Sequence, residues 1–157
     1  MPRRPYKKIT MVKDPVYNSI TVAKLINYLI VDGKKTVAKK IVYSVLDEIK
    51  KQRLDPIVTL EEAIKNTAPN FEVKPRRLGG ASYMVPIEVR KERKLFLSLN
   101  WIIEAAKARP NKQFKTFAEK LLAEILDAYK NIGQAVAKRQ QTEKLAEANK
   151  AFAHLKW

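Results

Sequence analysis

Chemically reactive side chains are scarce in this sequence. The only histidine, His154, lies near the end of the chain, and cysteine is absent, which excludes thiol catalysis, disulfides and cysteine-based zinc sites. Gly33-Lys34-Lys35-Thr36 resembles the end of a phosphate-binding loop, but that motif needs a glycine where Tyr28 stands. Carboxylates mostly alternate with lysines at helical spacing, as in Asp47-Glu48 before Lys50-Lys51, which is typical of solvated ion-pairing faces. The sequence therefore predicts a protein that is not an enzyme and uses no metal ion or cofactor.

Positively charged side chains are abundant instead. The chain has 32 Lys and Arg against 16 Asp and Glu, a formal net charge of +16 in 157 residues. Such a charge repels itself unless a polyanion neutralises it, and phosphate backbones are the commonest polyanions. An anionic membrane is the alternative, but the longest clean apolar stretch, Tyr28 to Val31, is far shorter than a membrane-spanning helix. We therefore expect a nucleic-acid partner and no membrane.

The basic residues gather in groups at predicted loops and helix ends, where backbone N–H groups can also reach phosphates. The groups are Arg3, Arg4, Lys7, Lys8 and Lys13 near the N-terminus; Lys34 and Lys35 in the turn from Asp32 to Lys40; Arg76 and Arg77; the stretch from Arg90 to Lys94, which includes Arg93; and Lys107, Arg109, Lys112 and Lys115. Any single group could be a solvated face, but the shared placement favours a binding function.

Hydrophobic periodicity predicts a mainly α-helical domain that positions these groups. Six helices are expected, over about 19–31, 34–52, 55–68, 92–108, 112–129 and 133–152. Ser19 and Asp55-Pro56 are typical helix starts, and Gly33 suits the end of the first helix. Residues 1–18, with three prolines, are predicted to form an extended basic N-terminal arm, and 19–157 the helical RNA-binding domain.

Between the third and fourth helices the hydrophobic period changes to 2, which predicts a β-hairpin at about 71–90. We expect Phe71 to pair with Val89, which would place the apolar side chains on one face and leave Gly79-Gly80-Ala81 as a three-residue loop. The two prolines in these strands cannot donate ladder hydrogen bonds, so the hairpin is expected to project rather than join a larger sheet.

Trp101 has two interpretations. Leu99 and Ile102 belong to one apolar stripe of its helix, and Trp101 falls nearly opposite. A helix buried on both faces is the favoured interpretation, and stacking of Trp101 on a nucleic-acid base is the alternative.

The residues alone leave both RNA and DNA open as the nucleic-acid partner. The Asp32-Gly33 turn between two helices could belong to a helix-turn-helix DNA-binding regulator. The supposed recognition helix, however, offers no Arg, Asn or Gln for base edges until Gln52, and scattered basic loops suit folded RNA better. The DNA-binding regulator and an RNA-processing enzyme that uses carboxylates and a metal ion remain alternatives.

Four stretches together resemble the bacterial-type ribosomal protein S-seven family: MPRR, Val31-Asp32-Gly33-Lys34-Lys35, VKPRRLGGASYMVPIEVR and the ending AEANKAFAHLKW. The similarity runs essentially end to end. It implies a structural constituent of the small ribosomal subunit that binds the 3′ major domain of its ribosomal RNA and nucleates assembly of the head. It also implies that the protein lines the transfer-RNA exit (E) site and the messenger-RNA exit path.

The same resemblance implies partners and contact residues. The partners would be small-subunit ribosomal RNA, E-site transfer RNA, messenger RNA and neighbouring small-subunit proteins including S-eleven and S-nine, with no DNA. The location would be the ribosome of a bacterial cytoplasm or of an organelle that makes its own proteins. Carried across by position, the ribosomal-RNA contacts would be Arg3, Arg4, Lys7 and Lys8; Lys34 and Lys35; Arg76 and Arg77; Arg90, Arg93 and Lys94; and Arg109, Lys112 and Lys115. Arg77, Gly79, Gly80, Ser82 and Tyr83 would lie on the exit-site side.

Overall fold

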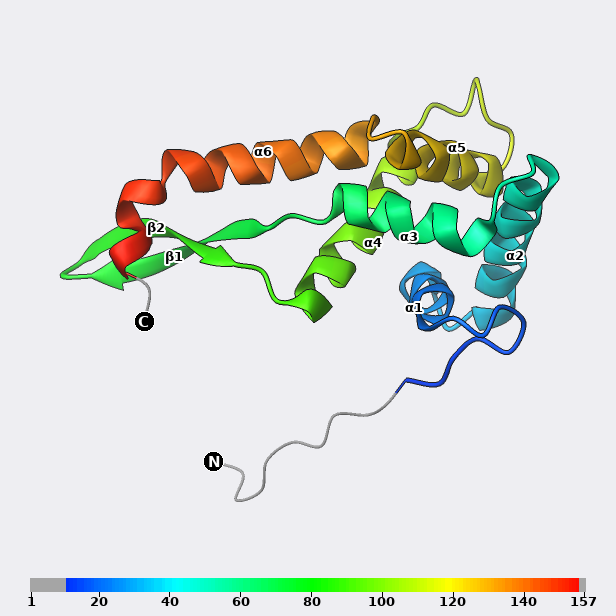
Figure 1. The fold of residues 1–157 in the computed structure, drawn as a ribbon, viewed down its shortest axis with the longest axis horizontal. Helices are drawn as coiled ribbons and strands as arrows, with labels where there is room; N and C mark the ends of the chain where they lie inside the picture. Colours follow the sequence, from blue (N-terminus) through cyan, green and yellow to red (C-terminus); the bar gives the residue numbers. More distant parts are fainter. Residues whose placement is uncertain (1–10, 156–157) are drawn as a thin grey trace, which may run out of the picture.

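The computed structural model describes residues 11–155 and has six α-helices, one β-hairpin and a short 3₁₀ helix in that range. In chain order the elements are α1 (Ile20–Leu29), α2 (Lys35–Lys51), α3 (Pro56–Thr67), β1 (Phe71–Leu78), β2 (Ala81–Glu88), α4 (Lys91–Ala108), α5 (Phe117–Tyr129), α6 (Gln134–Ala148) and the 3₁₀ helix η1 (Lys150–Leu155). The predicted mainly α fold, with a hairpin between the third and fourth helices, is confirmed. Helices α1 to α5 form a body, from which the hairpin and α6 extend side by side in one direction (Figure 1).

The core of the body is built from the apolar side chains of its helices. Its largest fully enclosed side chains include Leu25, Leu46, Leu60, Leu99, Leu121 and Ile125, each at most 1% exposed. Full burial of one such side chain contributes roughly 1.5–3 kcal/mol. Helix α6 supplies only Ala135 and Val136, at its start, to this core. Trp101 is partly buried and packs against the core, which supports the first of its two interpretations.

The predicted helix starts at Ser19 and Asp55 are confirmed. The Ser19 hydroxyl accepts a hydrogen bond from the Val22 N–H, and the Asp55 carboxylate accepts from the N–H groups of Ile57 and Val58. These side chains satisfy donors that an α-helix leaves unpaired in its first turn.

The predicted start of the fifth helix at about residue 112 is wrong. Helix α5 begins at Phe117, after Thr116 accepts from the Glu119 N–H as a cap. Residues 109–116 form a loop, in which the Arg109 carbonyl oxygen and Asn111 Oδ1 accept hydrogen bonds from Lys120 Nζ, on the first turns of α5, at 2.6 and 2.5 Å. These bonds hold the chain in an irregular path.

The hairpin register differs by one residue from the expected one. Phe71 pairs with Glu88 instead of Val89, and Leu78 pairs with Ala81, so the loop is Gly79-Gly80 alone. Both glycines have positive φ, at 54° and 88°, as a two-residue type I′ turn requires.

This register divides the apolar side chains of the hairpin between two faces. Because paired residues point to the same side, Pro86 lies on one face with Phe71, and Val85 lies on the other with Tyr83. Val85 and Pro86 are nonetheless both buried, since α6 and η1 pack against the hairpin. The prediction of one apolar face was wrong because the ribbon is covered on both sides near its base.

Candidate nucleic-acid interface

Most of the described basic residues that were predicted to contact nucleic acid lie in two separate regions. One is the hairpin with its base, and the other is formed by two loops of the body. These body loops are the α1–α2 loop, residues 30–34, and the α4–α5 loop, residues 109–116. Both body loops lie in the half of the molecule opposite the hairpin tip (Figure 1). A nucleic acid that contacts both regions must therefore extend along much of the protein.

The α1–α2 loop presents Lys34 and, at the start of α2, Lys35, and both are exposed. Lys34 Nζ is 3.9 Å from Asp32 Oδ2, but both side chains are mostly in solvent, so this ion pair contributes little. The first turn of α2 has no acidic residue, so its N–H groups add to the positive potential. This loop suits phosphate binding.

The α4–α5 loop presents Lys112 and Lys115, which are also exposed. The backbone N–H of Lys115 donates to Glu119 Oε2 at 2.8 Å, and this bond lowers the pKa of the Glu119 carboxyl. The contact fixes the backbone at the end of the loop, while the Lys115 side chain extends from an exposed position.

Arg109 has a different environment from the two lysines of its group. Its guanidinium donates to Glu124 Oε2 at 2.6 and 2.9 Å and also to Asp127. Glu124 is fully buried, and its other carboxylate oxygen accepts from the Ala135 N–H at 3.1 Å. Burial opposes the charge of Arg109, but the bonds to Asp127 and Glu124 outweigh it and raise the pKa of Arg109. This structural partnership was not apparent from the sequence, and an RNA contact of Arg109 stays a prediction.

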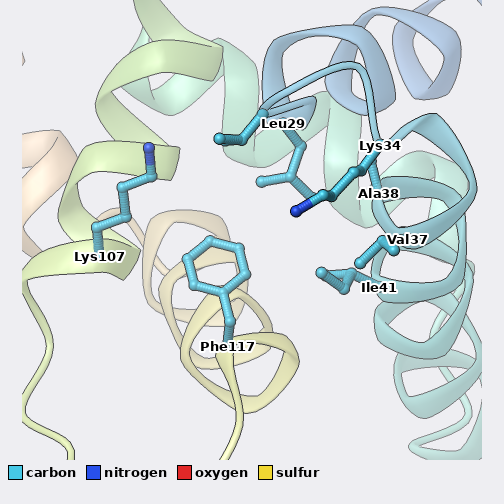
Figure 2. Close-up of a pocket in the computed structure, with 8 residues that line it drawn as sticks. Leu29, Lys34, Val37, Ala38, Ile41, Lys107 and Phe117 are labelled. Carbon is cyan, nitrogen blue, oxygen red and sulfur yellow. The ribbon is translucent and has the colours of Figure 1, made fainter.

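An apolar pocket of about 240 Å³ lies between the α1–α2 loop with the start of α2 on one side and the adjoining ends of α4 and α5 on the other. It is lined by Leu29, Val31, Lys34, Val37, Ala38, Ile41, Lys107 and Phe117. Figure 2 shows Lys107 on one side, Lys34 on the other and the Phe117 ring between them. The structure thus brings together two basic groups that are far apart in the sequence, and the pocket between them was not predicted.

The hairpin tip gathers most of the residues that were assigned to an exit-site surface. Arg77 pairs with Ser82 across the ribbon, and both are exposed together with Gly79 and Gly80. Tyr83 is half-buried, with its ring centroid 5.4 Å from that of Phe152 in η1. Its ring therefore attaches the tip to the C-terminal segment, a role that the sequence did not reveal.

Arg76 lies on the opposite face of the ribbon from Arg77. It pairs across the strands with Tyr83 and is half-buried. The two neighbouring arginines therefore point to different sides, as successive residues of a strand must. Arg77 is the more accessible of the two to a ligand at the tip.

The basic residues at the hairpin base also make contacts within the protein. Arg93 Nε lies 3.3 Å from Glu72 Oε2, and Lys94 Nζ donates to Asn70 Oδ1 at 2.7 Å. Arg90 is the exposed N-cap of α4. Arg93 therefore joins β1 to α4, and Lys94 joins α4 to the residue just before β1. Arg90 and Arg93 are both exposed, whereas Lys94 is half-buried.

The described end of the N-terminal arm is attached to the body. Asp14 is 4% exposed and accepts from the N–H groups of Val16 and Tyr17 and from the Tyr43 hydroxyl at 2.8 Å. Burial and this hydrogen bond raise the pKa of Tyr43 to about 12. Lys13 beside it is exposed. Arg3, Arg4, Lys7 and Lys8 lie outside the described residues, so their predicted contacts remain predictions.

The described residues offer neither a metal site nor a membrane span. Residues 11–155 contain no group of three or more His, Cys, Asp or Glu that could hold a metal ion. No helix among these residues is both long and apolar enough to cross a membrane. The ring of His154 bonds the Ala151 carbonyl oxygen at 2.8 Å through Nδ1, which gives this histidine a local structural contact.

Comparison with known proteins identifies the family. Residues 1–150 match the family described as ribosomal protein S7p/S5e. The chain is 52% identical to the small ribosomal subunit protein uS7 of Caldicellulosiruptor bescii, and 51% identical to that of Dictyoglomus turgidum, over the full length of each. The protein of the same name from Thermotoga maritima is 48% identical, again with both chains fully covered. The chain therefore belongs to the ribosomal protein S7p/S5e family.

Proposed function

We propose that this protein is a structural constituent of the small ribosomal subunit that binds the 3′ major domain of small-subunit ribosomal RNA. The observation that carries the proposal is the placement of exposed lysines and arginines on loops at both ends of a member of this ribosomal protein family. Lys34, Lys35, Lys112 and Lys115 form the body contact, and Arg77 and Arg90 the hairpin contact. The N-terminal arm adds Arg3, Arg4, Lys7 and Lys8.

The mechanism is charge neutralisation combined with shape recognition. Lysines on loops contact phosphates and fix the position of the RNA without reading its sequence. The core holds the two body loops at fixed positions relative to each other. Only an RNA fold with phosphates at matching positions can therefore contact both loops at once. Binding at two distant regions would hold separate RNA segments together and so nucleate assembly of the subunit head.

The hairpin is proposed to face the transfer-RNA exit site and the messenger-RNA exit path. The support is the exposed tip with Arg77, Gly79, Gly80 and Ser82, which extends away from the body. Proteins S-eleven and S-nine are proposed neighbours, and the ribosome of a bacterial cytoplasm or an organelle is the proposed location. Arg76, Arg93, Lys94, Arg109 and Tyr83, which have contacts within the protein, would position these surfaces and contact RNA with their remaining hydrogen-bonding capacity.

The experiment that tests this proposal measures binding of the full chain to a transcript of bacterial small-subunit ribosomal RNA at several salt concentrations. Each neutralised phosphate lowers log K by roughly 0.7–0.9 per tenfold increase in salt. About six contacts would therefore give a slope of about −4 to −5. A flat salt dependence, or equal affinity for duplex DNA of the same length, would contradict the proposal. Binding that requires a divalent metal and is accompanied by RNA cleavage would favour the enzyme alternative.

Charge reversal at the hairpin tip separates RNA binding from folding. We expect Arg77→Glu to weaken binding to the same transcript and to change the free energy of unfolding by less than about 0.5 kcal/mol, because this side chain is exposed. The control is Lys144→Glu, an exposed position on α6 outside the proposed contacts. Equal RNA affinity of the two variants would remove the tip from the interface.

A further inference from the structure

The apolar pocket beside the α1–α2 loop is not explained by phosphate binding. Its lining is mostly aliphatic, with one aromatic ring from Phe117. Two of its side chains, Val31 and Val37, are 59% and 51% exposed. A nucleic acid that bound only through its phosphates would leave this apolar surface exposed to water. We therefore expect a separate chemical group to fill the pocket.

The charges around the pocket indicate the chemistry of that occupant. Lys34 and Lys107 stand on opposite sides of it (Figure 2). Lys107 makes no ion pair or hydrogen bond with the part of the chain that the structure describes, and Lys34 has only the long contact to Asp32. Both ammonium groups can therefore pair with anionic groups at the rim of the apolar pocket.

We propose that this pocket binds a single unstacked base of the ribosomal RNA, with Lys34 and Lys107 on the two phosphates that flank it. A nucleotide combines a flat, largely apolar base with a phosphate on each side, which matches the lining and the two cations. Unstacked bases in RNA loops commonly insert against aromatic side chains, and Phe117 supplies the ring. The inference rests on the proposed function, because it requires that the body loops contact RNA.

An acidic protein segment with one apolar side chain is the competing occupant, and the position of the pocket argues against it. Further exposed lysines flank the pocket, Lys35 at the start of α2 and Lys112 and Lys115 on the α4–α5 loop. A polynucleotide that crosses the pocket meets these charges in succession. A single apolar side chain with one carboxylate would use only a small part of them.

The test compares two valines with matched exposure. Val37 lines the pocket, and Val58 on α3 is 52% exposed and outside it. We expect Val37→Trp, which fills the pocket, to weaken binding to the ribosomal RNA transcript at least about 5-fold. This factor corresponds to the smallest loss of affinity expected when one base–aromatic stack is removed. Val58→Trp should leave affinity unchanged. Chemical probing should show one nucleotide that the wild-type protein and Val58→Trp protect and that Val37→Trp exposes.

Two further variants separate the contribution of the Phe117 ring to RNA binding from that of the two lysines. Phe117→Leu keeps an apolar lining without the ring, and should also weaken binding about 5-fold while the thermal unfolding transition is retained. Lys34→Ala combined with Lys107→Ala should reduce the salt slope by about 1.5, whereas Lys50→Ala with Lys144→Ala should not change it.

Because the chain has no cysteine, Val37→Cys gives one attachment site for a photoactivatable label. In assembled subunits the label should cross-link to one nucleotide, and the same label on Val58→Cys should not reach that nucleotide. Wild-type affinity for Val37→Trp, or cross-links from position 37 to protein alone, would overturn the base-binding pocket. Neither result would affect the proposed function, which fails only if the wild-type protein does not bind the transcript in a salt-dependent manner.

Discussion

The helical body and the hairpin carry similar basic side chains on very different supports. In the body, the lysine-bearing loops connect helices whose apolar faces form one continuous core. The hairpin consists of two strands whose large apolar residues Phe71 and Met84 are about half exposed. A two-stranded ribbon has little stability alone, so this one depends on α6, η1 and the contacts at its base. The comparison suggests a preformed binding surface on the body and a surface on the hairpin that opens more easily.

The largest expected difference between the two regions concerns side-chain truncation. Leu99→Ala in α4 should lower the free energy of unfolding by about 2–5 kcal/mol, because Leu99 is fully buried and leaves a cavity. Met84→Ala in the hairpin should change it by less than about 0.5 kcal/mol. Urea denaturation of both variants measures the contrast. Similar losses would show that the hairpin is as firmly packed as the body.

The next effect concerns the buried ion pairs of the body. Arg109→Ala should lower the free energy of unfolding by about 3 kcal/mol, because the buried Glu124 carboxylate loses its cationic partner. The control is Lys138→Ala, which removes an exposed 2.5 Å ion pair to Glu104 and should cost less than about 1 kcal/mol. If both variants lost the same small amount, Arg109 would be available to bind RNA instead of holding α5.

A smaller and local effect is expected at the hairpin turn. Gly80→Ala should destabilise the hairpin by about 1–2 kcal/mol, because φ at this position is 88° and an L-residue is strained there. Gly79→Asn should be tolerated, since Asn-Gly is a favoured type I′ sequence. Hydrogen exchange of the β1 and β2 amides should rise in the first variant while global stability stays nearly constant. Unchanged exchange in Gly80→Ala would argue against the two-residue turn.

The smallest effect concerns the attachment of residues 11–18 to the body, and it depends on pH. The pKa of Tyr43 is raised to about 12 by burial and by its hydrogen bond to Asp14, against about 10 in an unfolded chain. The contribution of Tyr43 to the free energy of unfolding is therefore complete below about pH 10 and is lost as the pH rises toward 12. The free energy of unfolding should fall less over this interval in Tyr43→Phe than in the wild type. Parallel curves for the two proteins would contradict the raised pKa.

Sequence reasoning succeeded where one local signal determined the structure. The start of α1 follows from Ser19 as a cap, and the start of α3 from Asp55 with proline behind it, since a cap is satisfied within three residues. The start of α5 has a local signal as well, Thr116 as a cap with Glu119 three residues later, and the prediction missed it. What no local signal shows is that the ammonium of Lys120 holds the preceding loop through the Arg109 carbonyl oxygen and Asn111.

The candidate interface shows the same division. Exposed lysines such as Lys34 and Lys112 could be predicted because the local charge exceeds what nearby carboxylates can pair. The packing of Tyr83 against Phe152, and the pocket bounded by Lys34, Lys107 and Phe117, could not. Those contacts join residues from distant parts of the chain, and no periodic pattern records them.

By itself the sequence determined the mainly helical class, the place of the hairpin, the large positive charge and the family, because these follow from composition, periodicity and local motifs. Only the tertiary structure decided the hairpin register, since a one-residue shift depends on what covers each face of the ribbon. It also decided that Arg109 would be held by Glu124 while Lys112 and Lys115 remained in solvent. The physical reason is that a buried carboxylate requires a cationic partner in space, whichever part of the chain supplies it.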